Sequence, residues 1–220
     1  MNKKVKFWQD QNTIQLLAES LKKNQVSVGT SDTVLGFLSN LSQSGFERLN
    51  EIKKRSQKPY IILINSIEKL PLFTDQIIDE QFKKLISKCW PGPVTIIFKS
   101  KQNVSDYLKT FNNTIAIRIS NHEGLLQLLT NFDGLFSTSA NIAGHEIPQS
   151  LNELDPDIIK QIQYIVLEKN SINHRYPIIP STILDGTGSK IKVIREGAYP
   201  IKELEAIYGQ PFDWFKNGFK

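Results

Sequence analysis

The stretch VGTSDTVLG, residues 28–36, begins at Val28, two residues after Val26, and ends in a glycine. Residues 26–29 predict a short strand, and the hydroxyl and carboxylate side chains that come next predict a loop at its end. Loops of this composition present short, stiff hydrogen-bonding groups to a bound ligand. The stretch therefore indicates a binding site built at the end of a strand.

Polar stretches of the same kind recur along the chain. They are IKKRS at 52–56, WPGPVT at 90–95, TIAIRI at 114–119, STSANIAG at 137–144, PSTILD at 180–185 and VIREG at 193–197. Each is a weak signal alone, because basic runs commonly lie on solvated helix faces and hydroxyl side chains often bond their own backbone. Their order and spacing along the chain are much more specific.

Hydrophobic periodicity predicts interleaved helices and strands between these stretches. We expect helices at 13–23 with a cap at Asn12, at 44–54, from 78 up to a stop at Pro91, at 125–132, at 150–162 with an interruption near Pro156, and at 200–208. We expect strands at 26–29, 60–65, 94–98, 114–119, 134–139, 164–167, 182–185 and 191–195, with a hairpin turn at 186–190. The pattern favours an α/β domain with a mixed sheet.

Length and composition limit the class of protein. The 220 residues, 40% hydrophobic and 22% charged, are typical of a globular chain. We expect one domain over 1–220, with motifs from about 26 to 197 and a tail at 210–220 that packs on the body. No apolar run approaches the ~20 residues of a membrane span, and a single cysteine, Cys89, favours the cytoplasm.

The charged residues favour an anionic ligand. The net charge of +5 suits an anionic substrate or an RNA contact. The chain has 22 lysines and only 5 arginines, yet Arg55, Arg118 and Arg195 all fall within the polar stretches. Because a guanidinium binds carboxylate and phosphate through two donors, this bias favours anion contacts at these points. The three histidines share no metal-ligand spacing, which argues against a zinc site.

In order and spacing, the polar stretches resemble the motifs of the YrdC/Sua5 family, the L-threonylcarbamoyladenylate synthases. The family pattern comprises a P-T-[DE]-T-x-Y-G loop, a K-x-R pair, W-P-G-P-[LV]-T, V-R-x-P, S-x-N, S-T-I and L-R-x-G. The matching positions are Thr30 to Gly36, Lys53 with Arg55, Trp90 to Thr95, Arg118, Ser139 with Asn141, Ser181 to Ile183, and Arg195 to Gly197. The similarity covers nearly the whole chain and looks like the short, single-domain bacterial form.

The resemblance implies a fold, a reaction and partners. The fold is a YrdC-like twisted mixed sheet with flanking helices around a concave basic cavity. The reaction joins L-threonine, bicarbonate and ATP to give threonylcarbamoyl-AMP and pyrophosphate, with Mg²⁺ beside the phosphates. The product would serve the t6A modification of adenosine 37 in tRNA through partner transferase proteins, with a contact to tRNA.

The resemblance also assigns residues to the two substrates. ATP is assigned to Lys53, Arg55, Thr114, Ser139, Asn141 and Arg195. Threonine is assigned to Thr33, Arg118, Ser137 and Ser181. No residue is assigned as general acid or base and none as a metal ligand, because such a site works by positioning and charge neutralisation.

The chain departs from the family pattern at several positions, and two other functions stay open. Thr30 and Ser31 stand for Pro-Thr, Leu35 for the tyrosine and Ser56 for a proline, and the family's serine after G-x-P is either replaced by Ile147 or displaced. The first alternative is an RNA-binding module of the same fold without nucleotidyl transfer. The second is a carbamoyl-transfer module like that of hydrogenase maturation factors, whose additional segments this chain lacks.

Overall fold

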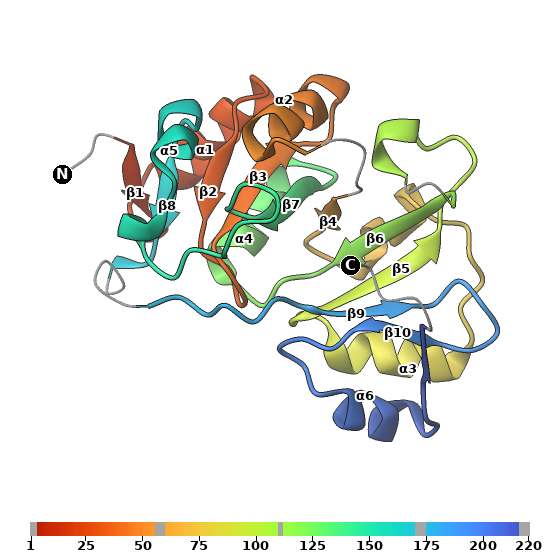
Figure 1. Ribbon diagram of the computed structural model, residues 1–220. Coiled ribbons are helices and arrows are strands. Elements are labelled where there is room, and N and C mark those ends of the chain that lie inside the picture. The colour runs from red at the N-terminus through yellow and green to blue at the C-terminus, as the bar shows by residue number, and fades with distance from the viewer. Residues whose placement is uncertain (1–3, 56–59, 110–111, 170–174, 216–220) are drawn as a thin grey trace.

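The computed structural model describes residues 4–55, 60–109, 112–169 and 175–215, and all their strands join one eleven-stranded sheet (Figure 1). The strands are β1 (Val5–Phe7), β2 (Ser27–Gly29), β3 (Gly36–Asn40), β4 (Ile61–Leu63), β5 (Val94–Lys99), β6 (Thr114–Arg118), β7 (Leu135–Ser139), β8 (Ile165–Leu167), β9 (Thr182–Asp185), β10 (Lys192–Arg195) and β11 (Asp213–Trp214). Their order is β1-β8-β2-β3-β7-β4-β6-β5-β9-β10-β11. The sheet contains parallel pairs, such as β4–β6, and antiparallel pairs, such as β3–β7, which confirms the predicted mixed α/β sheet.

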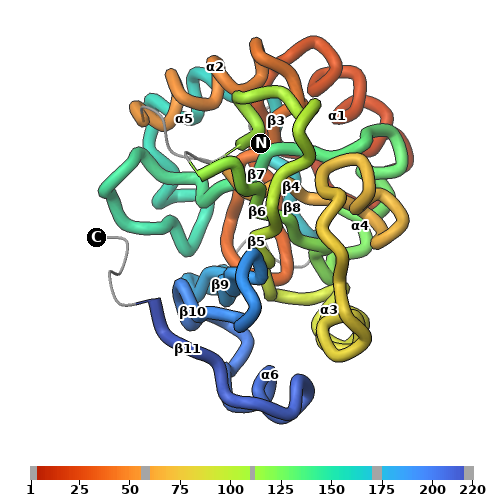
Figure 2. Tube along the Cα trace, turned by 90° about the vertical axis from the view of Figure 1, so that its right-hand side faces the viewer, coloured from red at the N-terminus to blue at the C-terminus, as the bar shows by residue number. Residues whose placement is uncertain are grey.

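Helices flank both halves of the sheet. They are α1 (Thr13–Lys22), α2 (Gln43–Lys53), α3 (Glu80–Cys89), α4 (Glu123–Leu128), α5 (Pro156–Gln161) and α6 (Ile201–Tyr208), with short 3₁₀ turns at Ile67–Leu72, Asp106–Leu108, Leu129–Asn131 and Leu151–Glu153. Helix α1 packs against α4, α2 against α5, and α3 against α6. Figure 2 shows α3 and α6 beside the β9–β10 end of the sheet, away from α1, α2 and α5.

Helix α3 illustrates how the sequence sets these elements. Its buried stripe, Phe82, Leu85 and Ile86, follows the helical spacing and faces the sheet. The Asp79 carboxylate accepts a hydrogen bond from the Phe82 amide at 2.8 Å and caps the first turn. The helix ends at Cys89, immediately before Trp90 and Pro91. The predicted stop at Pro91 is confirmed.

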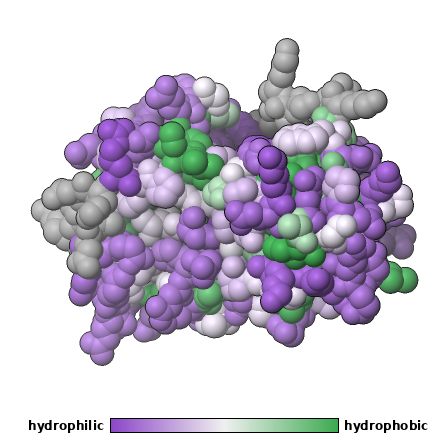
Figure 3. Space-filling model, turned by 90° about the horizontal axis from the view of Figure 1, so that it is seen from below, coloured by the Kyte–Doolittle hydropathy of each residue, from purple (hydrophilic) through white to green (hydrophobic). Residues whose placement is uncertain are grey.

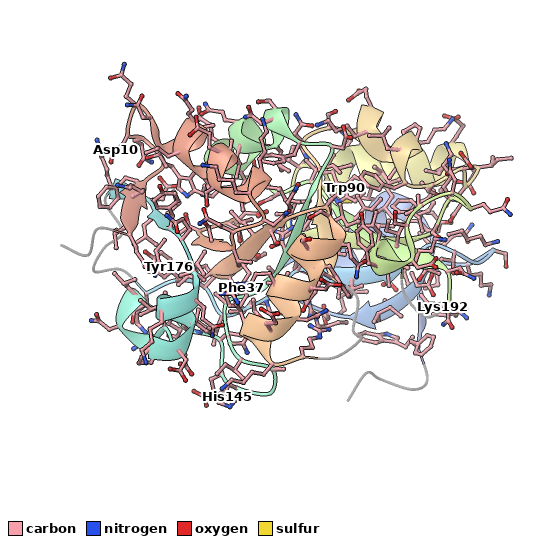
Figure 4. The ribbon with its side chains drawn as sticks, turned by 90° about the horizontal axis from the view of Figure 1, so that it is seen from above. Asp10, Phe37, Trp90, His145, Tyr176 and Lys192 are labelled. Atoms are coloured by element: carbon pink, nitrogen blue, oxygen red, sulfur yellow. The ribbon has the colours of Figure 1, made fainter. Side chains whose placement is uncertain are left out.

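Alternation along the central strands divides the core into two clusters. Phe37 and Ile62 face the larger cluster, and their neighbours Leu38 and Leu63 face a second cluster built with α1 and α4. Phe37 has no solvent-exposed surface. Figure 4 shows it inside the molecule, whereas the exposed His145 lies at the periphery.

Some elements differ from the sequence prediction. Strand β3 was not predicted, because it has few apolar residues and depends on pairing with both β2 and β7. The predicted helix at 150–162 begins only at Pro156, after Asp155, whose side chain accepts from the Asp157 amide at 2.7 Å. Proline suits this first helical position because the missing N–H would have no partner there. Asn12 precedes α1 but makes no side-chain capping bond.

The C-terminal part of the described chain lies against the sheet. Strands β9 and β10 pair antiparallel, so the hairpin predicted at 186–190 is confirmed. Strand β11 pairs with β10, and Phe212 before it is buried. Since this part joins the same sheet as β1, we propose that the chain forms one domain. Among the described residues, no helix has the length and hydropathy needed to span a bilayer.

Candidate functional site

A cavity of about 220 Å³ opens where the loop after β2 and the ends of β6, β7 and β10 approach one another. Its lining comprises Ser31, Thr33, Val34, Gly36, Arg55, Tyr60, Ile61, Leu63, Arg118, Ser120, Ser137, Thr138, Ser139, Ile147, Pro180, Ser181, Ile183 and Arg195. Seven of the ten residues assigned from the sequence are in this set. Lys53, Thr114 and Asn141 are not.

Three arginines from separate parts of the chain line this cavity. Arg55 follows α2, Arg118 ends β6 and Arg195 ends β10. Burial lowers the pKa of Arg195, and the charge of Arg118 lowers it further. The described lining residues include no carboxylate, so the cavity favours an anionic ligand.

Arg118 is held on three sides by the protein. Its Nε donates to the Gly92 carbonyl at 3.1 Å, its Nη1 donates to Thr33 Oγ1 at 3.0 Å, and its Nη2 pairs with the Asp32 carboxylate. The residue is only 5% exposed, although it contributes to the cavity wall. Its contacts use one N–H on each nitrogen, so Nη1 and Nη2 each keep a second donor for a ligand.

Asp32 lies beside the cavity wall, and the sequence reasoning did not single it out. Its Oδ1 accepts from Arg118 and from the Ser120 hydroxyl, and its Oδ2 accepts from the Asn121 amide at 3.1 Å. Burial raises the pKa of this carboxyl, but the Arg118 charge and the three hydrogen bonds outweigh it, so the pKa lies below its usual value. Asp32 lies inside the stretch 28–36, but the sequence of that stretch does not indicate that Asp32 pairs with Arg118.

Lys53 points into the protein, behind the cavity wall. Its Nζ donates to the Ser139 and Asn141 carbonyls at 2.7 and 3.0 Å, and to Asn141 Oδ1 at 3.0 Å. The Lys53 carbonyl accepts from the Ala143 amide at 3.0 Å. Lys53 therefore fastens the loop after β7 to the end of α2. Burial, together with the nearby charge of Arg55, lowers the pKa of Lys53 to about 7.

The β9–β10 hairpin supplies the opposite wall. Arg195 donates from Nη2 to the Ser181 carbonyl at 2.8 Å, and the Ser181 hydroxyl lies 2.8 Å from Thr95 Oγ1. Gly197 permits this arrangement, since a Cβ there would lie 2.2 Å from the Pro180 carbonyl oxygen. The glycine of the R-x-G motif therefore serves close backbone packing.

Tyr60 lines the cavity, and the sequence reasoning did not single it out either. The Arg55 guanidinium lies over its ring, 5.3 Å from the centroid. The Tyr60 hydroxyl donates to Asn50 Oδ1 at 2.6 Å, which fixes the ring against α2. Burial raises the pKa of Tyr60 to about 12, with Arg55 opposing the rise, so the phenol stays protonated.

The remaining assigned and divergent positions have distinct surroundings. Thr114 begins β6, at the end opposite Arg118. Leu35 is 1% exposed and belongs to the core, whereas Ile147 lines the cavity as an apolar patch. Thr30 accepts from Trp8 Nε1 at 2.8 Å and lies outside the lining. Ser56 lies outside the described residues.

Sequence comparison identifies the class of this chain. The family model Sua5_yciO_yrdC, described as telomere recombination, matches residues 19–197. The chain belongs to this family, which confirms the resemblance drawn from the motifs.

Individual relatives narrow the class. A threonylcarbamoyl-AMP synthase of Pseudoalteromonas translucida is 31% identical over 186 residues, 83% of this chain and 97% of that protein. A protein of Methanocaldococcus jannaschii is 32% identical over 196 residues, covering 87% and 88% of the two chains.

Solved structures agree with the family and the fold. The structure of P. abyssi Sua5 complexed with L-threonine has a TM-score of 0.81 and 26% identity over 92% of this chain and 58% of that one. E. coli YciO shares the fold, with a TM-score of 0.76 and 21% identity over 89% and 94% of the two chains.

Proposed function

We propose that this chain is an enzyme that makes threonylcarbamoyl-AMP from L-threonine, bicarbonate and ATP and releases pyrophosphate. The observation that carries the proposal is the cavity, in which three arginines and a set of serine and threonine hydroxyls converge. The names of the relatives support the same activity.

The assigned residues divide the cavity between the substrates. Arg118, Thr33, Ser137 and Ser181 would contact threonine, and Arg55, Arg195 and Ser139 would contact the phosphates of ATP. Lys53 and Asn141 would support the phosphate side by holding the end of β7, where Ser139 lies. Thr114, outside the lining, would contact the nucleotide beyond its phosphates.

The chemistry needs positioning more than proton transfer from the protein. The threonine amine attacks the carbon of bicarbonate, and loss of water gives a carbamate. A carbamate oxygen then attacks the α-phosphorus of ATP, the bond to the β-phosphate oxygen breaks, and pyrophosphate leaves. Fixed guanidinium groups stabilise the charge on the phosphates and leaving group. No histidine, lysine or carboxylate lines the cavity among the described residues.

Cofactor, partners and compartment follow from the same proposal. The described residues contain no cluster of carboxylates or histidines that could hold a metal ion, so we assign Mg²⁺ no ligand in this chain and no step. The product would pass to the proteins that complete the t6A modification of tRNA. A buried, unpaired Cys89 is consistent with the cytoplasm as the compartment.

The RNA-binding alternative is not favoured. A cavity of about 220 Å³ suits a small polar ligand, whereas a nucleic-acid surface presents a basic face along a strand or duplex. The face in Figure 3 is largely hydrophilic, with separate hydrophobic patches and no single dominant one.

The proposal is tested by pyrophosphate release. The purified chain is incubated with ATP, threonine and bicarbonate, and each component is then omitted in turn. We expect release only when all three are present. Salt-sensitive RNA binding without pyrophosphate release would support the alternative instead.

We predict that threonine is preferred to both valine and serine. A site that bonds the substrate hydroxyl leaves its own polar groups unpaired with valine, which we expect to lower kcat/KM at least about tenfold. Serine lacks only a methyl group, worth about 1–3 kcal/mol in a fitted pocket. Pyrophosphate release with each amino acid measures the preference, and equal turnover with valine would exclude a pocket for threonine.

We also predict that Arg55→Ala weakens ATP binding about tenfold or more, as expected when a charge-assisted contact is lost. Threonine affinity should stay near that of the parent chain. The matched control is Arg48→Ala on α2, whose guanidinium pairs with Glu51 at 2.8 Å on the surface. Calorimetric titration with ATP measures both variants, and equal ATP affinity in the two would remove Arg55 from the phosphate site.

A further inference from the structure

Asp32 connects the loop after β2 to the end of β6. It accepts from the Arg118 guanidinium and the Ser120 hydroxyl through Oδ1, and from the Asn121 amide through Oδ2. Its side chain is 12% exposed and that of Arg118 is 6% exposed. Asp32 is absent from the lining, so it reaches a ligand only through the groups it holds.

The hydrogen bonds beyond Arg118 fix the direction of each hydroxyl. Ser31 Oγ donates its proton to the Val34 carbonyl at 2.9 Å, so it has none left for Thr33. The 3.1 Å contact between the Ser31 and Thr33 hydroxyls therefore has Thr33 as the donor. Thr33 Oγ1 in turn accepts from Arg118 Nη1 at 3.0 Å.

This direction determines what Thr33 can recognise. Its proton is used on Ser31 and one lone pair is used on Arg118, so one lone pair remains for a ligand. A lone pair accepts from an ammonium or a hydroxyl and repels a carboxylate. The second N–H groups on Arg118 Nη1 and Nη2 donate to a carboxylate and repel an ammonium. The wall thus offers a donor site beside an acceptor site, which matches the carboxylate and the adjacent N–H group of an α-amino acid.

We propose that Asp32 is a positioning residue for amino-acid recognition: by holding Arg118, it orients both the guanidinium and the Thr33 hydroxyl toward the two polar groups of the substrate. The proposal rests on the function proposed above and specifies its amino-acid subsite. It predicts that damage to Asp32 falls on threonine binding and spares ATP.

A purely electrostatic role for Asp32 predicts the reverse. Removing the carboxylate beside Arg118 raises the positive charge near a cavity that three arginines line. If charge alone mattered, threonine and ATP would both bind as well as before or more tightly. The sign of the change therefore separates the two roles.

The test uses Asp32→Asn and Asp32→Glu in the full chain. Asparagine lacks the negative charge, and its amide N–H cannot accept from the Asn121 amide. Glutamate keeps the charge but displaces the carboxylate by one methylene group. Calorimetry with L-threonine and a non-hydrolysable ATP analogue should show a threonine Kd raised about tenfold or more in each variant, the usual scale for a misplaced binding group. The Kd of the ATP analogue should change less than about twofold, within ordinary surface-variant effects.

Asp10→Asn is the control, since Asp10 pairs with Lys169 at 2.9 Å on the surface. It should leave both affinities unchanged. If Asp32→Asn fails to fold, Asp32→Glu alone decides the question. A threonine Kd equal to that of the parent chain in a folded Asp32 variant would overturn the proposal, as would tighter binding.

A second readout does not depend on the proposed function. A dicarbonyl reagent that modifies arginine should label Arg118 slowly in the parent chain and several-fold faster in the Asp32 variants. Arg48, whose side chain is 39% exposed, is the internal reference. Unchanged labelling of Arg118 would overturn the positioning role even if threonine did not bind. The parent chain could bind neither threonine nor the ATP analogue while Arg118 is still labelled faster in the variants. That result would refute the proposed function and leave the positioning role of Asp32 standing.

Discussion

Replacement of Arg118 by methionine is expected to lower the free energy of unfolding by about 3–5 kcal/mol, because it leaves a buried carboxylate without its cation. Asp32 would keep only the Ser120 and Asn121 donors, and Thr33 would lose the guanidinium that orients its hydroxyl. Urea denaturation followed by circular dichroism measures the change. Threonine binding should be lost in the same variant.

The control for this prediction is Arg195→Met. Arg195 reaches the same cavity, but within the described residues its hydrogen bonds go to the Ser181 carbonyl, so we expect a loss of about 1–2 kcal/mol. If both substitutions lower the unfolding free energy equally, the Arg118–Asp32 ion pair contributes no more to stability than the hydrogen bonds of Arg195.

Acid should narrow the difference between Arg118→Met and the parent chain. The pKa of Asp32 is depressed in the folded state, so its contribution is fully present above the unfolded value of about 4 and is lost as the pH falls through the folded pKa. Methionine removes that contribution at every pH. A difference in unfolding free energy that stays constant from pH 6 to pH 3 would contradict this account.

Replacement of Lys53 by methionine is expected to cost about 2–4 kcal/mol of stability, because partly buried oxygens of Ser139 and Asn141 lose their donor. The end of β7, where Ser139 lies, would also loosen, so pyrophosphate release should fall with it. The neighbour Lys54 is exposed, and Lys54→Met should change the stability by less than about 0.5 kcal/mol. Chemical denaturation at pH 8 measures both variants.

The Lys53 effect should depend on pH in a defined direction. With a folded pKa of about 7 against an ordinary value of 10.5, the unfolded chain binds more protons between these two values. Stability contributed by Lys53 therefore rises with pH across that window, at most about 1.4 kcal/mol per pH unit. The difference in unfolding free energy between the parent chain and Lys53→Met should widen from pH 7 to pH 9. A difference that stays constant or narrows would show that the buried amine stays charged.

Most of the fold could be predicted because local patterns carry it. The helical stripe of α3 and the apolar runs of β4, β5 and β6 lie where their spacing places them. Strands β1 and β3 could not be predicted, since their short sequences become strands only through pairing with β8, and with β2 and β7. Such pairing depends on contacts between distant residues.

The site was predictable to a similar degree. The scarcity of arginine singled out Arg55, Arg118 and Arg195, and the structure brings all three to one cavity. Asp32 was missed because its partner Arg118 stands 86 positions along the chain. The inward direction of Lys53 could not be predicted either, since a basic run reads the same whether its amines face solvent or protein.

The two walls of the cavity come from opposite ends of the sequence. Ser31 and Thr33 belong to the first, and Ser181 and Arg195 belong to the second. During synthesis, the early strands can collapse while β9 and β10 are still inside the ribosome, since chains fold from the N-terminal side as they emerge. The site is therefore absent from a nascent chain until Arg195 has emerged. A ligand that contacts both walls binds only to completed, folded chains. By mass action it stabilises these chains against the opening that exposes them to proteolysis.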